Sequence, residues 1–193
     1  SSIDRYGRYS YSAQADIIVW NMAQLATALL PLMPDPEAAV EPFTTQIHQM
    51  PDMIRSQWYR RFGAKIGIAD PTVEDGKLVT DLLTLMQNAK ADFTNTFRGL
   101  IDGTARDQFL DRTAFDTWAK GWSARIASED DATSVMEQAN PALIPRNHRI
   151  EAMITAATEG DDSQFHRLTA AYADPYSTHP ETEDLRRPPM DNE

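Results

Sequence analysis

The 193-residue sequence contains no cysteine. This absence excludes a disulfide framework, a zinc site built from thiolates and a thiol nucleophile within these residues. Stability must therefore come from the packing of apolar side chains, which make up 41% of the sequence beside 24% charged residues. Such a composition is typical of a globular protein and lies far from that of a disordered chain.

Positive charge is also scarce. The 18 lysines and arginines face 29 aspartates and glutamates, so the formal net charge is -11 and the isoelectric point is near 4.7. This excess would repel a nucleic acid or an anionic membrane unless a local basic patch overcame it. The basic cluster of Arg55, Arg60, Arg61 and Lys65 falls within one predicted helix and indicates a solvated helix face. We therefore expect neither nucleic acid nor membrane as a partner.

Long apolar runs and targeting signals are missing as well. No stretch approaches the roughly 20 apolar residues of a membrane span, and Ser1 to Ser12 lack the basic-then-apolar order of a signal peptide. A cytoplasmic location follows by default. The missing initiator methionine suggests that residue 1 is not the natural start.

Motifs that bind nucleotides or metals are not found either. The eight glycines are scattered, and none of G-x-G-x-x-G, G-x-x-x-x-G-K or G-x-S-x-G occurs. The four histidines show no metal-ligand spacing, and His148 with Glu151 indicates only a surface pair. The acidic runs 129–131 and 161–162 fall where helix N-termini are expected, and a helix dipole favours acidic residues there. We therefore predict no catalytic, cofactor-binding or metal-binding residue in this chain.

What the sequence does have is helical periodicity. Between Asp16 and Leu30, apolar residues surround the helix axis and leave only a narrow polar stripe, which is typical of a helix at the centre of a domain. We expect this helix to be the most buried element, with Trp20 fully packed and Trp20→Ala costing about 3 to 5 kcal/mol. Pro31 and Pro34 end the helix.

Further helices are predicted from apolar residues that recur every three or four positions. Their approximate ranges are 37–49, 52–66, 72–86, 93–101, 113–126, 129–139, 147–159 and 163–172. Thr72 with Asp75 and Thr113 with Asp116 resemble capping boxes, and Asn147 suits an N-cap. Alternating Val, Ile or Thr runs and a repeat of fixed period are both missing, which disfavours strands and a solenoid.

The sequence thus predicts an all-α fold in three parts. An extended lead-in covers residues 1–15, a single helical domain covers 16–176, and a flexible acidic, proline-rich tail covers 177–193. The tail has little apolar surface besides Leu185 and Met190 to offset the entropy of ordering. We therefore expect residues 177–193 to be mobile or held only by docking onto other residues, and their removal should barely change the melting temperature.

Three segments resemble, in this order, the motifs of one known family. They are Gly7-Arg8-Tyr9-Ser10-Tyr11 with Gln14 and Trp20-Asn21-Met22, then Phe93-Thr94-Asn95-Thr96-Phe97-Arg98 with Phe115-Asp116-Thr117-Trp118, and then Asn140-Pro141-Ala142-Leu143-Ile144-Pro145-Arg146-Asn147-His148-Arg149. The family is that of selenoprotein O, and the resemblance runs from Gly7 to about Pro189. Its signature positions, whose individual roles stay open, are Gly7, Arg8, Tyr9, Trp20, Asn21, Arg98, Asn140, Pro141, Arg146 and Asn147.

The resemblance implies a fold and a function. Selenoprotein O proteins are described as pseudokinases that bind ATP with magnesium and transfer AMP to protein hydroxyl groups. This chain would be the C-terminal, helical C-lobe-like part of such a protein adenylyltransferase with a protein-kinase-like fold, and helix 16–30 its buried central helix. The nucleotide lysine and the metal-binding Asn and Asp of the family precede the first motif and would have no counterpart here. The family's C-terminal cysteine segment is also missing.

The implied cofactors and partners belong to the parent protein. ATP and magnesium would bind there, and the partners of this chain would be the upstream kinase-like lobe of the same polypeptide and substrate proteins, in a bacterial cytoplasm. Two other hypotheses stay open. A stand-alone helical protein-interaction module would have a start codon near Ser1 and no upstream kinase-like lobe. A magnesium-dependent helical enzyme would use the acidic runs and respond to magnesium titration.

Overall fold

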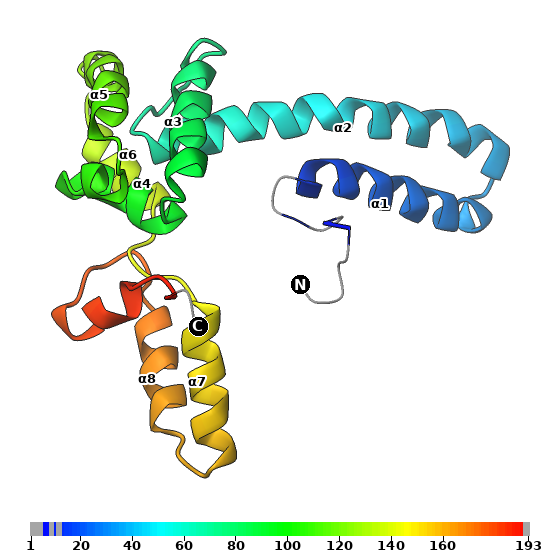
Figure 1. Ribbon diagram of the computed structural model, residues 1–193. Coiled ribbons are helices and arrows are strands. Elements are labelled where there is room, and N and C mark those ends of the chain that lie inside the picture. Colours follow the sequence, from blue (N-terminus) through cyan, green and yellow to red (C-terminus); the bar gives the residue numbers. More distant parts are fainter. Residues whose placement is uncertain (1–5, 8–9, 11–12, 191–193) are drawn as a thin grey trace. The chain divides into compact units, whose positions relative to one another are not determined.

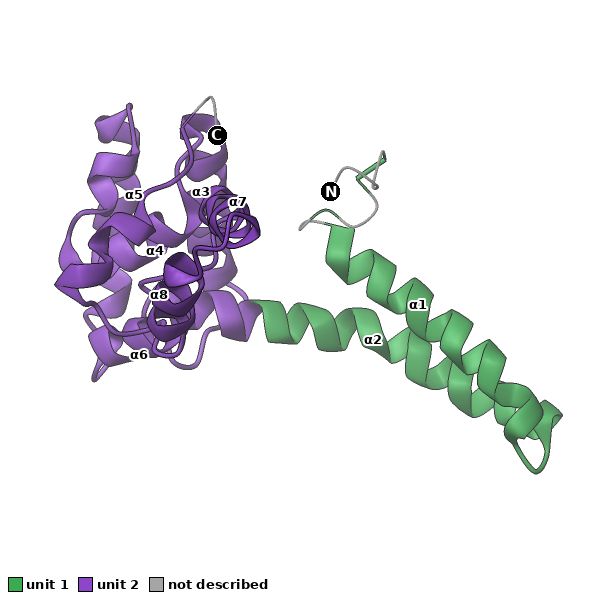
Figure 2. Ribbon diagram, turned by 90° about the horizontal axis from the view of Figure 1, so that it is seen from below, with its two compact units in different colours: residues 1–58 green, residues 59–193 purple. Residues whose placement is uncertain are grey.

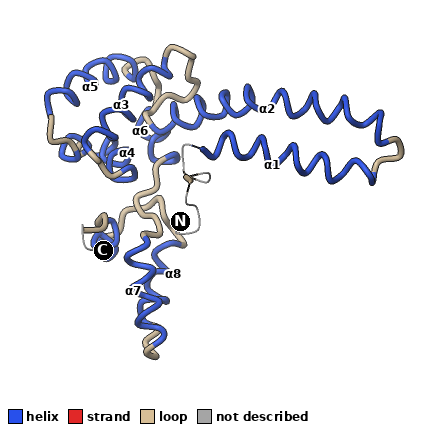
Figure 3. The backbone as a smooth tube through the Cα atoms, turned by 45° about the vertical axis from the view of Figure 1, so that its right-hand side comes forward, coloured by secondary structure: helices blue, strands red, loops and turns tan. Residues whose placement is uncertain are grey.

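The computed structural model describes residues 6–7, 10 and 13–190, and within these ranges it contains helices and loops but no strand (Figures 1 and 3). The predicted all-α fold is therefore confirmed. The α-helices are α1 (Gln14–Leu29), α2 (Pro36–Lys65), α3 (Asp75–Ala89), α4 (Phe93–Asp102), α5 (Arg112–Ile126), α6 (Ala132–Ala139), α7 (Asn147–Thr158) and α8 (Ser163–Tyr172). Short 3-10 helices lie at η2 (Leu30–Leu32), η3 (Ala105–Gln108) and η4 (Pro180–Arg186).

The chain divides into two compact units, residues 1–58 and 59–193 (Figure 2). Helix α2 begins in the first unit and ends in the second. The predicted extended lead-in falls mostly outside the described residues, and α1 begins at Gln14. A single domain over 16–176 stays a prediction.

The first unit is a hairpin in which the first part of α2 runs back along α1 (Figures 1 and 2). The structure corrects the expected burial of α1, because Ile17 is its one buried residue and Trp20 is 49% exposed. A helix that is apolar all round needs neighbours on every side to be buried, and this unit offers α1 one long partner. The Asp35 carboxylate starts the return helix by accepting a hydrogen bond from the Ala38 N–H at 3.0 Å.

Helix α2 is longer than the sequence predicts. The prediction of a break near residue 50 is wrong, since the 30-residue helix continues through Pro42 and Pro51. Each proline removes one backbone hydrogen bond at a cost of about 3 kcal/mol. The uninterrupted helix shows that its other interactions outweigh this cost.

Helix α1 with η2 tests the prediction that no stretch approaches the length of a membrane span. The stretch Gln14–Leu32 is long and apolar enough to cross a membrane, with a mean hydropathy of 1.3, and very little of it is buried. The statement that no stretch approaches a span is therefore wrong for this segment. Length and composition alone are weak evidence for a span, because core helices and signal sequences meet the same criteria.

The second unit has an apolar core built from α2, α3, α4 and α5. Phe97, Ile66, Ile68, Leu82 and Val79 are among its largest fully buried side chains. On α5, the stacked rings of Trp118 and Trp122 donate indole N–H hydrogen bonds to the carbonyls of Leu78 and Ile66, at 2.9 and 2.7 Å. These aromatic residues therefore fix α5 against α3 and the loop after α2.

The segment after α8 docks onto α7 and α8, whereas the flexibility predicted for this tail stays a prediction. Leu185 of η4 is 1% exposed and packs in a cluster with Leu143 and Leu168. The Asp184 carboxylate pairs with Arg167 at 2.6 Å, and its backbone carbonyl accepts from Arg149 at 2.6 Å. One well-placed leucine and two arginines thus hold a segment whose composition suggests disorder; residues 191–193 lie outside the described ranges.

The predicted helix caps have mixed outcomes. The Thr72–Asp75 box is confirmed, because Asp75 accepts from the Thr72 N–H at 2.9 Å and Thr72 Oγ1 accepts from the Asp75 N–H at 3.4 Å. The Thr113–Asp116 box is wrong, since Asp111 caps α5 by accepting from the N–H groups of Thr113 and Ala114. Asn147 is the first residue of α7, and the N-cap position is that of Arg146.

Candidate functional site

The signature residues of the second and third motifs lie in the second unit, where a hydrogen bond joins Arg98 to Asn140. Arg98 lies on α4, Asn140 is the C-cap of α6, and Arg146 and Asn147 begin α7. Of these, Asn140 and Arg146 are buried and Asn147 is exposed. Pro141 follows the C-cap, after which the N–H groups of the next two residues both donate to the carbonyl of Pro175, at 2.8 and 3.0 Å.

The signature residues of the first motif lie in the first unit. Trp20 and Asn21 are exposed on α1, and Gly7 is exposed with a φ of 65°. Arg8 and Tyr9 lie outside the described residues. The first motif and the other two motifs thus belong to different units of the chain.

Asn140 is the centre of a polar cluster that joins three helices. The residue is 1% exposed, its Nδ2 donates to the Lys65 carbonyl at 2.8 Å, and its Oδ1 accepts from Lys65 Nζ at 3.2 Å. Its backbone carbonyl accepts from Arg98 Nη1 at 3.1 Å, and its N–H donates to the Met136 carbonyl at 2.9 Å. Each of its polar groups has a partner, so Asn140 ties the end of α2 to α4 and α6.

Lys65 contributes the cation of this cluster. Its Nζ also donates to the Ala139 carbonyl at 3.1 Å and lies 5.7 and 5.4 Å from the ring centroids of Phe93 and Phe97. Burial lowers the pKa of Lys65 below its ordinary value. The prediction of a solvated basic face is therefore wrong for Lys65, although Arg60 and Arg61 are exposed.

An open depression lies beside Arg98. It has a volume of about 640 Å³ and is lined by Arg98, Glu137, Gln138, Tyr176, Ser177 and Thr178. Arg98 donates from Nη2 to the Thr178 hydroxyl at 3.2 Å as well as to Asn140. With a single carboxylate in the lining and the arginine already paired, the depression resembles neither a phosphate-binding loop nor a magnesium site.

Arg146 forms a buried ion pair with Asp92. Two parallel hydrogen bonds join the guanidinium to the carboxylate at 2.8 and 3.0 Å, and the Asp92 side chain also caps α4 by accepting from the Asn95 N–H at 2.8 Å. Burial would raise the pKa of Asp92, but the hydrogen bonds from Arg146 and Asn95 outweigh it and lower that pKa. The pair joins the start of α4 to the start of α7.

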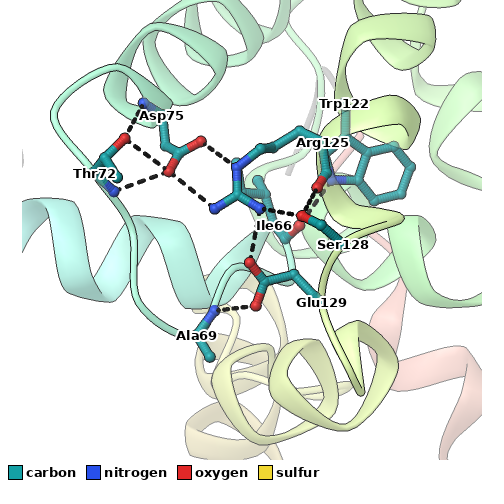
Figure 4. A network of polar contacts seen from close by, with 8 residues as sticks. All are labelled: Ile66, Ala69, Thr72, Asp75, Trp122, Arg125, Ser128 and Glu129. Carbon is teal, nitrogen blue, oxygen red and sulfur yellow. Dashed lines mark hydrogen bonds and ion pairs between the residues drawn. The ribbon is translucent and has the colours of Figure 1, made fainter.

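A second polar network surrounds Arg125 of α5 (Figure 4). Arg125 donates from Nε and Nη2 to the two Asp75 oxygens at 2.7 and 3.2 Å, and from Nη1 to Glu129 at 2.8 Å. Glu129 accepts in turn from the Ala69 N–H at 3.2 Å. The charged groups of this network bind one another and the backbone, and they fix the loop between α2 and α3 to α5. We therefore interpret the network as structural.

The acidic runs take part in helix capping and ion pairing. Glu129 pairs with Arg125, and Asp131 caps α6 by accepting from the Ser134 N–H at 3.0 Å. Asp161 accepts from the Ser163 N–H at 2.9 Å. Within the described ranges, no three His, Asp or Glu side chains are grouped so that they could hold a metal ion.

Sequence reasoning placed Lys65 on a solvated face and did not name Asp92. Lys65 could have been found, because it lies on the same helix face as Trp58 and Phe62, at spacings of seven and three. Asp92 precedes the apolar residues of α4 and could have been predicted as a cap. Its partner Arg146, 54 positions later, gives no local signal.

These features define the class of protein: an all-helical chain in which three signature residues, Arg98, Asn140 and Arg146, join helices of the second unit. Comparison with known proteins then narrows it. The chain is 55% identical over its full length to a protein nucleotidyltransferase YdiU from Roseobacter denitrificans and 53% identical to one from a Ruegeria species. A Clostridium botulinum relative of the same name is 38% identical over 92% of the chain.

The family model described as protein adenylyltransferase SelO matches residues 1–173. The chain therefore belongs to the SelO family. It spans 41% of the length of the Roseobacter and Ruegeria relatives, so the greater part of those proteins has no counterpart in it.

Proposed function

We propose that this chain is the C-terminal helical part of a pseudokinase-type protein adenylyltransferase, which transfers AMP from ATP to hydroxyl groups of other proteins. The observation that carries the proposal is the family match over residues 1–173 together with coverage of 41% of the nucleotidyltransferase relatives. The relatives are bacterial, and a bacterial cytoplasm is the proposed location.

ATP and magnesium do not fit the residues of this chain. Nucleotide transfer needs a phosphate-cradling loop, a lysine directed at the phosphates and carboxylate or amide ligands for magnesium. The glycine-rich motifs are missing from the sequence, and the described residues contain no group of three metal ligands. Lys65 is directed at carbonyls and aromatic rings. We therefore assign no step of the transfer to these residues.

The proposed role of the chain is that of a helical platform. The Asn140 cluster and the Asp92–Arg146 pair hold the helices of the second unit in fixed register, which a platform requires. Its proposed partners are the upstream kinase-like lobe of the same polypeptide and the protein substrates. In this arrangement, nucleotide and metal are bound by the rest of the polypeptide.

Calorimetry and a transfer assay test the proposal together. The 193-residue chain should bind no ATP with magnesium at millimolar nucleotide and transfer no labelled AMP to protein, because it is acidic and lacks the phosphate-binding parts. A complete polypeptide that contains it should do both. Saturable ATP binding by the chain alone would contradict the proposal that the rest of the polypeptide binds the nucleotide. A complete polypeptide without transfer activity would favour the alternative, a helical protein-interaction module.

A further inference from the structure

Helix α1 carries an apolar stripe that α2 leaves uncovered. Ile18, Met22, Leu25 and Leu29 are spaced by four, three and four residues, so they lie on one face of the helix. Their exposed fractions are 43%, 37%, 48% and 38%. Four large apolar side chains in one row form a continuous exposed surface, unlike isolated exposed residues, which are ordinary in soluble proteins.

A groove extends this stripe toward α2. It has a volume of about 420 Å³ and is lined chiefly by Met22, Leu25 and Leu29 from α1 and Phe43, Met50 and Met53 from α2. The lining residues recur at helical spacing on both helices, which is the geometry that receives an apolar helix or extended segment. Three of them are methionines, whose unbranched side chains adapt to an irregular partner surface.

We propose that an apolar segment of the complete polypeptide binds in this groove. The segment comes from the part that the SelO relatives have and this chain does not span. The inference rests on the proposed function, in which this chain is one part of such a polypeptide. The full length of the chain aligns with 41% of the Roseobacter and Ruegeria relatives, so most of their residues lie outside it and are available to cover the groove.

The charges near the groove argue against a membrane as the occupant. Asp16 lies in the first turn of α1, and Asn21 and Gln24 interrupt its apolar surface. Glu37 and Glu41 lie on the adjoining α2, so an anionic lipid surface would be repelled. The narrow apolar face between polar flanks fits a protein segment.

Thiol labelling can measure the covering of the groove directly, because the chain has no cysteine of its own. Leu25→Cys reports on the groove. Thr45→Cys, at an exposed position of α2 that does not line the groove, is the matched control. Each variant is made in the chain alone and in a complete Roseobacter relative in which this chain replaces the segment that it matches. The same hybrid without an introduced cysteine corrects for background labelling.

In the complete polypeptide, the labelling rate at Leu25→Cys should fall about tenfold or more, because a buried site reacts only during local opening. The rate at Thr45→Cys should change little. Equal rates at Leu25→Cys in both proteins would overturn the proposal. Protection in the chain alone that grows with its concentration, or with added phosphatidylcholine–phosphatidylglycerol vesicles, would assign the groove instead to a second copy or to a membrane.

Two additions keep the test decisive. If the hybrid fails to fold, the same cysteine is placed at the matching position of the unmodified Roseobacter relative, and the same change in rate is expected. AMP transfer is measured on the same samples. Protection without transfer would contradict the proposed function alone, whereas transfer without protection would contradict the groove assignment alone.

Discussion

Helices α1 and α4 differ in how many of their residues are buried, and each represents one of the two units. The 16-residue α1 buries Ile17 alone, whereas the 10-residue α4 buries Thr96, Phe97, Gly99 and Leu100. The more apolar helix is thus the less buried one. Burial depends on how many neighbouring elements a helix has, and α4 contacts both α6 and η3 while α1 has the hairpin partner α2.

The signature residues differ in burial between the two units in the same way. In the second unit, Asn140, Arg98 and Arg146 are joined by hydrogen bonds to groups far away in the sequence. In the first unit, Trp20 and Asn21 are exposed. Signature residues of the family thus join helices to one another in the second unit, whereas Trp20 and Asn21 lie at the surface of the first unit.

The largest expected effect concerns the ion pair that joins α4 to α7 in the second unit. Asp92→Ala leaves the Arg146 guanidinium buried without its carboxylate and removes the cap of α4. Loss of one partner of a buried pair costs about 3 to 5 kcal/mol of unfolding free energy. Urea denaturation measures it. The control is Asp116→Ala, which breaks the exposed pair with Arg106. Equal effects of the two substitutions would contradict a special role for the buried pair.

A somewhat smaller effect is expected at the C-terminal segment. Leu185→Ala removes a fully buried side chain from the cluster with Leu143 and Leu168, which should cost about 2 to 5 kcal/mol. Ile154→Ala, at an exposed position of α7, is the control. Thermal unfolding followed by circular dichroism distinguishes the two. Equal melting temperatures for Leu185→Ala and the unaltered chain would support the flexible tail that the composition predicts.

The Asp92–Arg146 pair also predicts a dependence of stability on pH. The pKa of Asp92 is lowered in the folded chain, so the ionised form contributes stability that is complete above the unfolded pKa of about 3.9. This contribution is lost as the pH falls through the lower folded pKa. The difference in unfolding free energy between the unaltered chain and Asp92→Asn should therefore be constant near neutral pH and shrink below about pH 4. A difference that stays constant at acid pH would exclude the ion pair as its source.

The sequence predicted local structure well where apolar spacing was regular. Phe93, Phe97 and Leu100 placed α4, and the Thr72–Asp75 box formed as expected. The prediction of two separate helices in place of α2 was wrong, because a helix can lose a backbone hydrogen bond at a proline and continue.

Partners far apart in the sequence were beyond prediction. The pairs Lys65–Asn140 and Asp92–Arg146 join residues 75 and 54 positions apart, and periodicity tells which face a residue occupies but not what it meets. Leu185 shows the same limit, since one buried leucine orders a segment whose average composition suggests disorder. The burial of α1 likewise depends on neighbours that no local pattern of α1 specifies.

The smallest expected effect concerns Trp20 and tests the comparison of the two units directly. Sequence reasoning predicts a cost of about 3 to 5 kcal/mol for Trp20→Ala, as for a core aromatic residue. With Trp20 49% exposed, the loss of its remaining buried area should cost only about 1 kcal/mol in this chain. Trp118→Ala provides the reference, because Trp118 is 6% exposed and donates to the Leu78 carbonyl, and its loss should cost about 3 to 5 kcal/mol. Urea unfolding of both variants measures the contrast. Equal costs would mean that Trp20 is packed as firmly as Trp118, which would contradict the contrast in burial between α1 and the second unit.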